Sequence, residues 1–315
     1  MNFRTEIQLQ KGRNQINYNS KLLLIGSCFS ENIGEKLDYF KFQTHSNPFG
    51  IVYNPAAIEN IITKAINNYQ YSENDIFELN ECWHCFDAHS NLSAPDKTKL
   101  LGNLNTALQV TNAGLKNASH IIITLGTSWA YRFIEKDFIV GNCHKVPQKK
   151  FLKEMLSVKK VIASLDNSIA LIKAINPTST IIFTVSPVRH LKDGFVENSQ
   201  SKAHLISAIN EVTAPQNNIF YFPSYEVMMD DLRDYRFYKS DLIHPNETAI
   251  NYIWEHFKSV WFDASIFPIM KEVATIQKGL AHKPFHPESE KHKTFLKTLQ
   301  QKIAVLTKKT GIIFS

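Results

Sequence analysis

Cysteine is scarce in this chain of 315 residues, with four in all. So few cysteines do not suggest a disulfide scaffold, and they fit a reducing compartment. Long apolar runs are missing too: stretches such as 121–123 and 181–183 are far too short to cross a bilayer. The first six residues also lack the apolar segment of a secretory signal. We therefore expect a cytoplasmic protein without a membrane span.

Phosphate-binding glycine motifs are absent as well. Neither Gly-x-Gly-x-x-Gly nor a Gly-Lys-Ser/Thr loop occurs, which argues against nucleotide-binding folds. The net charge is +6, but the lysines are scattered except near the C-terminus, so we expect a solvated surface and no nucleic-acid partner. What the chain has is 43% hydrophobic residues and 20% charged ones, which is enough apolar material for a sizeable core.

Short apolar runs that end in turn residues predict a parallel sheet. These runs lie at 22–25, 120–125, 180–185 and 219–222. Helical segments are expected between and after them, at 31–40 with Ser30 as its cap, 55–67, 96–117, 151–175, 199–212 and 247–262. Alternating strands and helices predict an α/β fold with helices on both faces of the sheet. Residues 76–86 and 130–140 are expected to add strands or hairpins.

The composition changes after Phe267-Pro268. Residues 282–293 are polar and basic, and 294–306 are expected to form a helix. We therefore divide the chain into an α/β domain, residues 1–265, and a C-terminal extension, residues 266–315.

Small polar residues follow the predicted strands, where open parallel sheets bind their ligands. The strand-end sequences are Gly26-Ser27-Cys28-Phe29, Gly126-Thr127-Ser128-Trp129 and Ser186-Pro187-Val188-Arg189-His190. A later loop carries Asp241 and His244, which are spaced so that both side chains can face the same way. The carboxylate would hold one ring nitrogen and leave the other as a general base for Ser27 or Cys28. The alternative is a surface pair that caps the helix near Glu247.

The strand-end motif resembles the signature of the GSCFA family, with Ser30 in place of its final alanine. Further blocks resemble that family in the same order, over roughly residues 20–260. They are Asn47-Pro48-Phe49-Gly50, His89-Ser90, Gly126-Thr127-Ser128-Trp129, Asn142-Cys143-His144-Lys145, Ser186-Pro187-Val188-Arg189-His190 and Asp241-Leu242-Ile243-His244-Pro245. The family is in turn similar to SGNH (GDSL-type) hydrolases, which implies a three-layer α/β/α fold with a flavodoxin-like parallel sheet.

The resemblance to SGNH hydrolases implies a role for each matching residue. Cys28 takes the nucleophile position, with Ser27 as the alternative if the turn shifts by one residue. Asp241 and His244 match the catalytic pair, and Gly50 and Ser128 match the oxyanion positions. Two departures stand out: a thiol replaces the hydroxyl nucleophile, and Ser128 replaces an asparagine donor. Residues expected to bind substrate are Asn47, His89, Trp129, Cys143, His144, Arg189 and His190.

Several of these residues also have structural interpretations. His89 and His144 could be hydrogen-bonded loop residues, and Arg189 could form an ion pair instead of holding a carboxylate or phosphate. Cys82 and Cys85 have the spacing of half a zinc site, but no second pair follows, so we expect ordinary packing and no metal or other cofactor.

Two functions follow from these residues. One is hydrolysis or transfer of an acyl group on a small-molecule, glycan or acyl-ester substrate. The other is non-catalytic binding of a glycan or acyl ligand in the same strand-end cleft. Loss of both the serine nucleophile and the asparagine donor favours the second.

Overall fold

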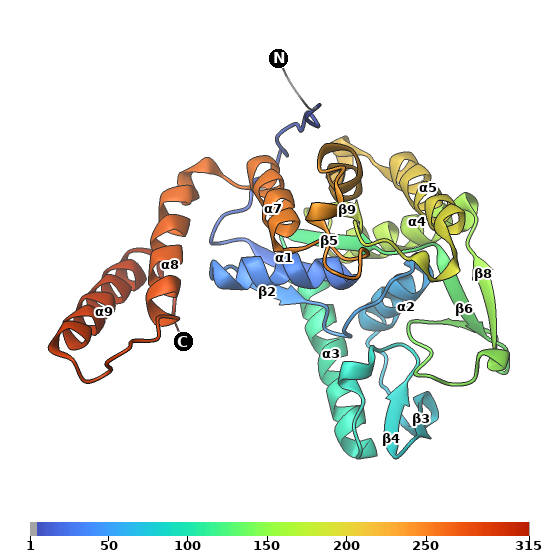
Figure 1. The fold of residues 1–315 in the computed structure, drawn as a ribbon. Coiled ribbons are helices and arrows are strands. Elements are labelled where there is room, and N and C mark those ends of the chain that lie inside the picture. Colours follow the sequence, from blue (N-terminus) through green and yellow to red (C-terminus); the bar gives the residue numbers. More distant parts are fainter. Residues whose placement is uncertain (1–4, 315) are drawn as a thin grey trace.

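A five-stranded parallel sheet forms the centre of the computed structural model, which describes residues 5–314 (Figure 1). Its order is β10-β9-β5-β1-β2, and every neighbouring pair is parallel. The strands are β1 (Lys21–Gly26), β2 (Gln43–Ser46), β5 (His120–Leu125), β9 (Thr180–Val185) and β10 (Ile219–Phe222). Numbered along the chain, this is the 2-1-3-4-5 order of the flavodoxin-like sheet. The α/β fold expected from the sequence is confirmed.

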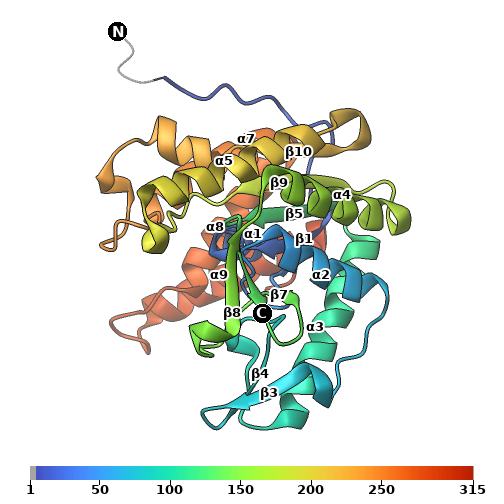
Figure 2. The same cartoon turned by 90° about the vertical axis from the view of Figure 1, so that its right-hand side faces the viewer.

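Helices cover both faces of this sheet (Figures 1 and 2). One face packs against α2 (Pro55–Ile66), α3 (Lys97–Asn117), α4 (Val158–Ile175) and α5 (Phe195–Val212). The other packs against α1 (Cys28–Tyr39) and α7 (Glu247–Trp261). Leu23 belongs to the first core and Leu24 to the second, because successive strand side chains point to opposite faces. Burial on both faces explains why the strands are continuous apolar runs.

Two smaller β structures extend beyond the sheet. β3 (Ile76–Leu79) and β4 (Cys82–Cys85) form an antiparallel hairpin. β6 (Trp129–Phe133), β7 (Phe138–Val140) and β8 (Phe151–Met155) form an antiparallel sheet in the order β7-β6-β8. The helix expected over 151–175 is therefore too long: its first five residues are β8, and α4 begins after the N-cap Ser157. Pairing with β6, which buries Phe151 beside Phe133, outweighs the local helical pattern.

The C-terminal segment forms two helices beside the domain, α8 (Phe267–Leu280) and α9 (Glu290–Thr310). Figure 1 shows them next to α1 and β2, on the side of the sheet opposite β6 and β8. They share a small core that also contacts Tyr18 and Phe40. A short helix, α6 (Ser224–Glu226), follows β10. Within residues 5–314, no helix has both the length and the apolar character needed to cross a membrane.

Candidate active site

The turn from β1 into α1 places Ser27 and Cys28 in different environments. Gly26 has φ +144°, and a Cβ there would lie 2.1 Å from the carbonyl oxygen of Thr124, so only glycine fits. Ser27 is fully buried, and its Oγ caps the helix by accepting the N–H of Phe29 at 3.3 Å. Ser30, which the sequence predicted as the cap, instead donates its hydroxyl to Thr124 Oγ1 at 2.7 Å. Cys28 is the first residue of α1 and remains partly exposed.

Cys28 lines a pocket of about 520 Å³ beyond the carboxyl ends of β1, β5 and β9. This is where the strand order reverses, between β1 and β5, and it is the usual ligand crevice of such sheets. Six of the residues singled out in the sequence line it: Cys28, Trp129, Cys143, Arg189, His190 and His244. The remaining lining residues are Tyr53, Asn54, Thr127, Tyr131, Val140, Gly141, Asn142, Val188, Leu191, Lys192, Asp193 and Ile243.

Asp241 forms a hydrogen bond with the ring of His244 and so orients it. Asp241 Oδ2 lies 2.8 Å from His244 Nδ1, and Oδ1 accepts the backbone N–H groups of Ile243 and His244 at 2.9 and 3.0 Å. These backbone N–H groups, together with the His244 ring, lower the pKa of Asp241 to about 2. An ionised carboxylate accepts only, so Nδ1 carries the proton and Nε2 of a neutral ring is left as the acceptor.

The loop that carries this pair is fixed to the pocket wall. Leu242 sits in the left-handed region, with φ 58°, and the N–H of Arg189 donates to the carbonyl of Ile243 at 3.2 Å. The Asp241–His244 loop therefore joins the segment that follows β9 and closes one side of the pocket.

Opposing electrostatic influences determine the pKa of the Cys28 thiol. Burial raises its pKa most, and the nearby carboxylate of Glu31 raises it further. The ammonium groups of Lys202 and Lys239 act in the opposite direction, together with the N–H of Cys28 itself. Because the balance raises the pKa, the thiol is protonated near neutrality, and its use as a nucleophile requires a base.

The two residues expected at oxyanion positions already use their backbone N–H groups in hydrogen bonds within the protein. Gly50 donates to the carbonyl of Asn47 at 2.7 Å. Ser128 is fully buried, and its N–H and hydroxyl both contact Ser201 Oγ, at 2.8 and 3.1 Å. Neither residue is part of the pocket lining.

Three residues expected to bind substrate hold loops instead of lining the pocket. Asn47 accepts the N–H of Gly26 at 2.8 Å, which fixes the strand-end turn. His89 caps a short helical turn through Nδ1, at 3.4 Å from the N–H of Asn91. His144 is buried and donates Nε2–H to the carbonyl of Cys85 at 2.7 Å, and burial lowers its pKa to about 4.

Pocket residues that sequence reasoning missed include Tyr53, Asn54 and Tyr131. Tyr53 and Asn54 precede the helix-starting Pro55, and the carbonyl of Tyr53 accepts the N–H of Gly126 at 2.8 Å. Tyr131 lies two residues beyond Trp129 on β6, so both face the same side. In the sequence, Tyr53 and Asn54 were recognisable only as residues before a helix start, and Tyr131 only as part of an alternating strand pattern.

His190 presents an unpaired nitrogen beside these residues. Its Nε2 has no hydrogen-bond partner among the described residues, and burial lowers its pKa to about 3. Its ring lies edge-on to Tyr53, with centroids 5.5 Å apart. The ring is therefore neutral near pH 7, and its Nε2 is buried in the pocket wall.

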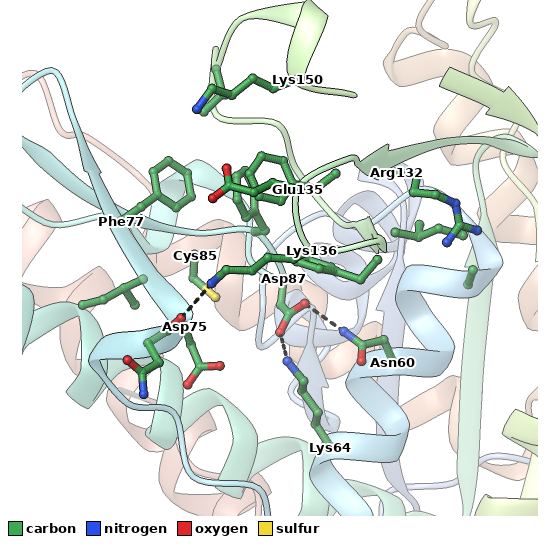
Figure 3. Close-up of a pocket in the computed structure, with 18 of the residues that line it drawn as sticks. Asn60, Lys64, Asp75, Phe77, Cys85, Asp87, Arg132, Glu135, Lys136 and Lys150 are labelled. Atoms are coloured by element: carbon green, nitrogen blue, oxygen red, sulfur yellow. Dashed lines mark hydrogen bonds and ion pairs between the residues drawn. The ribbon is translucent and has the colours of Figure 1, made fainter. Parts of the chain in front are cut away.

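A second, larger pocket of about 930 Å³ lies between α2, the β3–β4 hairpin and the β6–β7 strands (Figure 3). It contains Cys85, whose pKa burial raises to about 12, while Cys82 lies at the other end of β4. No group of three or more metal-ligating side chains occurs in the part of the chain that the structure describes. This pocket does not contain the strand-end residues.

Solved structures with a similar arrangement include three esterases. A carbohydrate esterase of family 3 from Talaromyces cellulolyticus is 8% identical, with a TM-score of 0.38, and covers 80% of this chain and 99% of its own. A mutant acetyl esterase with acetate ion is 10% identical, with a TM-score of 0.38 and coverages of 81% and 99%. An acetyl xylan esterase from Butyrivibrio proteoclasticus is 12% identical, with a TM-score of 0.39 and coverages of 78% and 64%.

No curated protein matches the sequence. Two family models do: the GSCFA family model matches residues 21–257, and the model of the GSCFA domain protein C-terminal domain matches residues 273–313. The first match spans β1 to α7 and contains every residue discussed at the pocket. The chain therefore belongs to the GSCFA family.

Proposed function

We propose that this protein hydrolyses or transfers acyl groups of ester substrates, with Cys28 as nucleophile and His244 as base. The observation that carries the proposal is that Cys28 and His244 line one pocket, with His244 held by Asp241 at 2.8 Å. The thiol is then the nucleophile, the imidazole is its base, and the carboxylate orients the imidazole, as in catalytic triads. Cys28 is preferred to Ser27 because Ser27 is fully buried and its Oγ caps α1.

The reaction would proceed in two acyl-transfer steps. His244 Nε2 takes the thiol proton while Sγ of Cys28 forms a bond to the ester carbonyl carbon. The tetrahedral intermediate collapses, the alkoxide leaves with the proton from His244, and a thioester remains on Cys28. Water, or an acceptor alcohol, then loses a proton to His244 and attacks the thioester. Cys28 leaves and regains that proton, and the acid or new ester is released.

The N-terminus of α1 supplies the charge stabilisation that this scheme needs. Cys28 is its first residue, so its backbone N–H is one of the N-terminal donors of the helix and would donate to the oxyanion. Asn54 is a second donor: its Oδ1 caps α2 by accepting the N–H of Ala57 at 2.9 Å, which leaves the amide NH₂ group for the pocket. We propose Asn54 in place of Ser128, whose polar groups contact Ser201.

The pocket walls suit a small ester, including one on a sugar. Trp129 and Tyr131 add aromatic rings to one wall, and the Lys153 ammonium lies over both, 4.6 and 5.6 Å from their centroids. Arg189 and Lys192 add positive charge on another wall. All four cysteines are free thiols, so we also propose the cytoplasm as its location.

An acyl-reactive probe tests the proposal directly. The protein is incubated with an electrophilic acyl or fluorophosphonate probe, and adducts are located by intact-mass and peptide mass measurement. We expect one adduct on Cys28, its loss in Cys28→Ala, and a slowing of about 100-fold or more in His244→Ala. Cys82→Ala, which changes a partly exposed thiol on β4, is the matched control and should label normally. Labelling at Cys143 instead of Cys28, or full labelling of both site variants, would contradict the proposal.

Two observations favour non-catalytic ligand binding in the same pocket. The raised pKa of Cys28 and the engagement of Ser128 by Ser201 remove two features of an efficient ester hydrolase. If the probe leaves the wild-type protein unmodified while sugars or acyl compounds protect Cys28 from alkylation, the binding function is the correct one.

A further inference from the structure

The C-terminal extension carries the net charge of the whole protein. Residues 266–315 contain nine lysines, no arginine and three glutamates, which give +6 and equal the net charge of the full chain. The other residues, 1–265, contain 26 basic and 26 acidic side chains and are therefore neutral. Such an uneven distribution of charge along a chain indicates a polyanionic partner, either a membrane surface or a nucleic acid.

Exposed apolar side chains gather at one end of the α8–α9 pair. Leu280 ends α8, Phe285 lies in the loop, and two more follow near the start of α9. The His282 ring lies 5.5 Å from the Phe295 ring, measured between centroids, so the loop folds against the first turns of α9. Four apolar residues at this end are at least 38% exposed: Leu280, Phe285, Phe295 and Leu296.

Lysines accompany these apolar side chains. Residues 280–297, which we call the hairpin tip, contain four exposed lysines and two glutamates: Lys283, Lys291, Lys293, Lys297, Glu288 and Glu290. Lys293 pairs with Glu290 at 2.9 Å, and the other three lysines form no ion pair within residues 5–314. Figure 1 shows the loop and the start of α9 turned away from the sheet, so a large partner can reach the tip.

The apolar residues favour a membrane over a nucleic acid. Phe285 is 98% exposed, and an aromatic ring could stack on an unpaired base, but Leu280 and Leu296 could not. Aromatic and aliphatic side chains beside lysines match the boundary between lipid headgroups and acyl chains, where apolar groups leave water and cations lie near phosphates.

We propose that the hairpin tip binds the protein to an anionic lipid surface. Phe285 and the two exposed leucines enter the acyl boundary, and the lysines lie among the headgroups. The attachment is peripheral and reversible, and it weakens with salt because its electrostatic part is screened. It does not depend on the proposed acyl chemistry, since no residue of the strand-end pocket belongs to the tip.

Sedimentation with lipid vesicles tests the proposal on the full chain. Vesicles of phosphatidylcholine with about 30% phosphatidylglycerol should bind the protein, and vesicles of phosphatidylcholine alone should not. Raising the salt from about 50 to about 300 mM should release it. Phe285→Ser should weaken the binding by about tenfold, and Lys283→Gln by about fivefold. Because both side chains are exposed, neither change should alter the Tm.

Two matched variants separate the tip from the rest of the surface. Val305→Ser removes an apolar side chain that is 65% exposed on α9 beyond the tip, and Lys149→Gln removes an exposed lysine just before β8. Both should bind vesicles as the wild type does. Losses as large as those of the tip variants would overturn the proposal, because the attraction would then belong to no particular surface.

Three further outcomes would also overturn it. The first is equal binding to both kinds of vesicle. The second is tighter binding of a single-stranded oligonucleotide than of anionic vesicles, which would assign the tip to nucleic acid. The third is a dimer, measured by light scattering, that Phe285→Ser converts to a monomer, which would assign the tip to a second copy of this chain.

Discussion

Two adjacent residues, Ser27 and Cys28, show how a single helix start separates a buried capping side chain from one that lines the pocket. Gly26 bends the chain at a φ that other residues avoid, and the Ser27 hydroxyl is then directed at the helix N–H groups. Cys28, one position later, faces the pocket. The sequence left Ser27 as the alternative nucleophile, and the positions of the two side chains favour Cys28.

Asp241 gives a prediction at this scale. Its folded-state pKa of about 2 lies below the value of about 3.9 for an unfolded aspartate, so the ionised form stabilises the fold above pH 4. That contribution is lost as the pH falls from about 4 to about 2. The difference in Tm between wild type and Asp241→Asn should therefore be largest above pH 5 and shrink toward pH 2. Thermal unfolding followed by circular dichroism measures it.

Asp166 on α4 provides the control for this pH series. It is exposed, and no hydrogen bond to it occurs among the described residues. Asp166→Asn should show a Tm difference that stays flat with pH. A constant gap between wild type and Asp241→Asn would show that Asp241 does not stabilise the loop through its charge.

At the scale of elements, a buried ion pair connects α2 to the segment after the β3–β4 hairpin. Figure 3 shows Asp87 between Asn60 and Lys64, and both α2 side chains donate to it, at 2.8 and 2.5 Å. Tyr71 adds a third donor at 2.9 Å. The Asp87 side chain is 5% exposed, so a missing donor would leave an under-compensated charge in the protein interior.

Replacing the cation of this pair should therefore be costly. Lys64→Met is expected to lower the free energy of unfolding by about 1–3 kcal/mol, because the buried carboxylate loses the only cationic donor that residues 5–314 give it. Lys97→Met removes the cation from an exposed pair with Glu73, whose side chain is 67% exposed, and should cost about 0–1 kcal/mol. Urea unfolding of both variants gives the comparison. Equal losses would mean that burial does not distinguish the two pairs.

The elements also show what sequence could and could not predict. The four apolar runs became β1, β5, β9 and β10, because burial on both faces leaves a clear pattern. β2 was missed since Gln43–Ser46 is polar and owes its conformation to pairing with β1. At the site, the GSCFA blocks predicted Cys28 and His244 as pocket residues. The burial of Lys202 on α5 was not predicted, because nothing in the sequence of a helix with mixed polarity indicates which of its lysines is buried.

The whole molecule combines the sheet domain with the α8–α9 pair. Tyr18 and Phe40 pack against both the α1–α7 core and the α8–α9 core, so the two parts share side chains. We retain the division at residue 265 as a proposal, with α8 and α9 as the extension. The pocket lies elsewhere, with none of its lining residues from α8 or α9.

This arrangement predicts that α9 can be loosened without loss of the site. Leu306 is fully buried between the two helices, and Leu306→Ala should weaken their packing by about 2–4 kcal/mol. Amide hydrogen exchange should accelerate in α9, while acyl-probe labelling of Cys28 stays at the wild-type rate. Val305→Ala, at a position 65% exposed, should change neither. Slower labelling in Leu306→Ala would show that the extension supports the pocket.

The spacing of the pocket residues along the chain has a consequence for synthesis. Cys28 emerges from the ribosome directly after β1, whereas Asp241 and His244 follow β10, the last strand of the sheet. A nascent chain therefore exposes the thiol well before the imidazole proposed to deprotonate it exists. The proposed pair of Cys28 and His244 is therefore complete only after translation has passed the whole sheet.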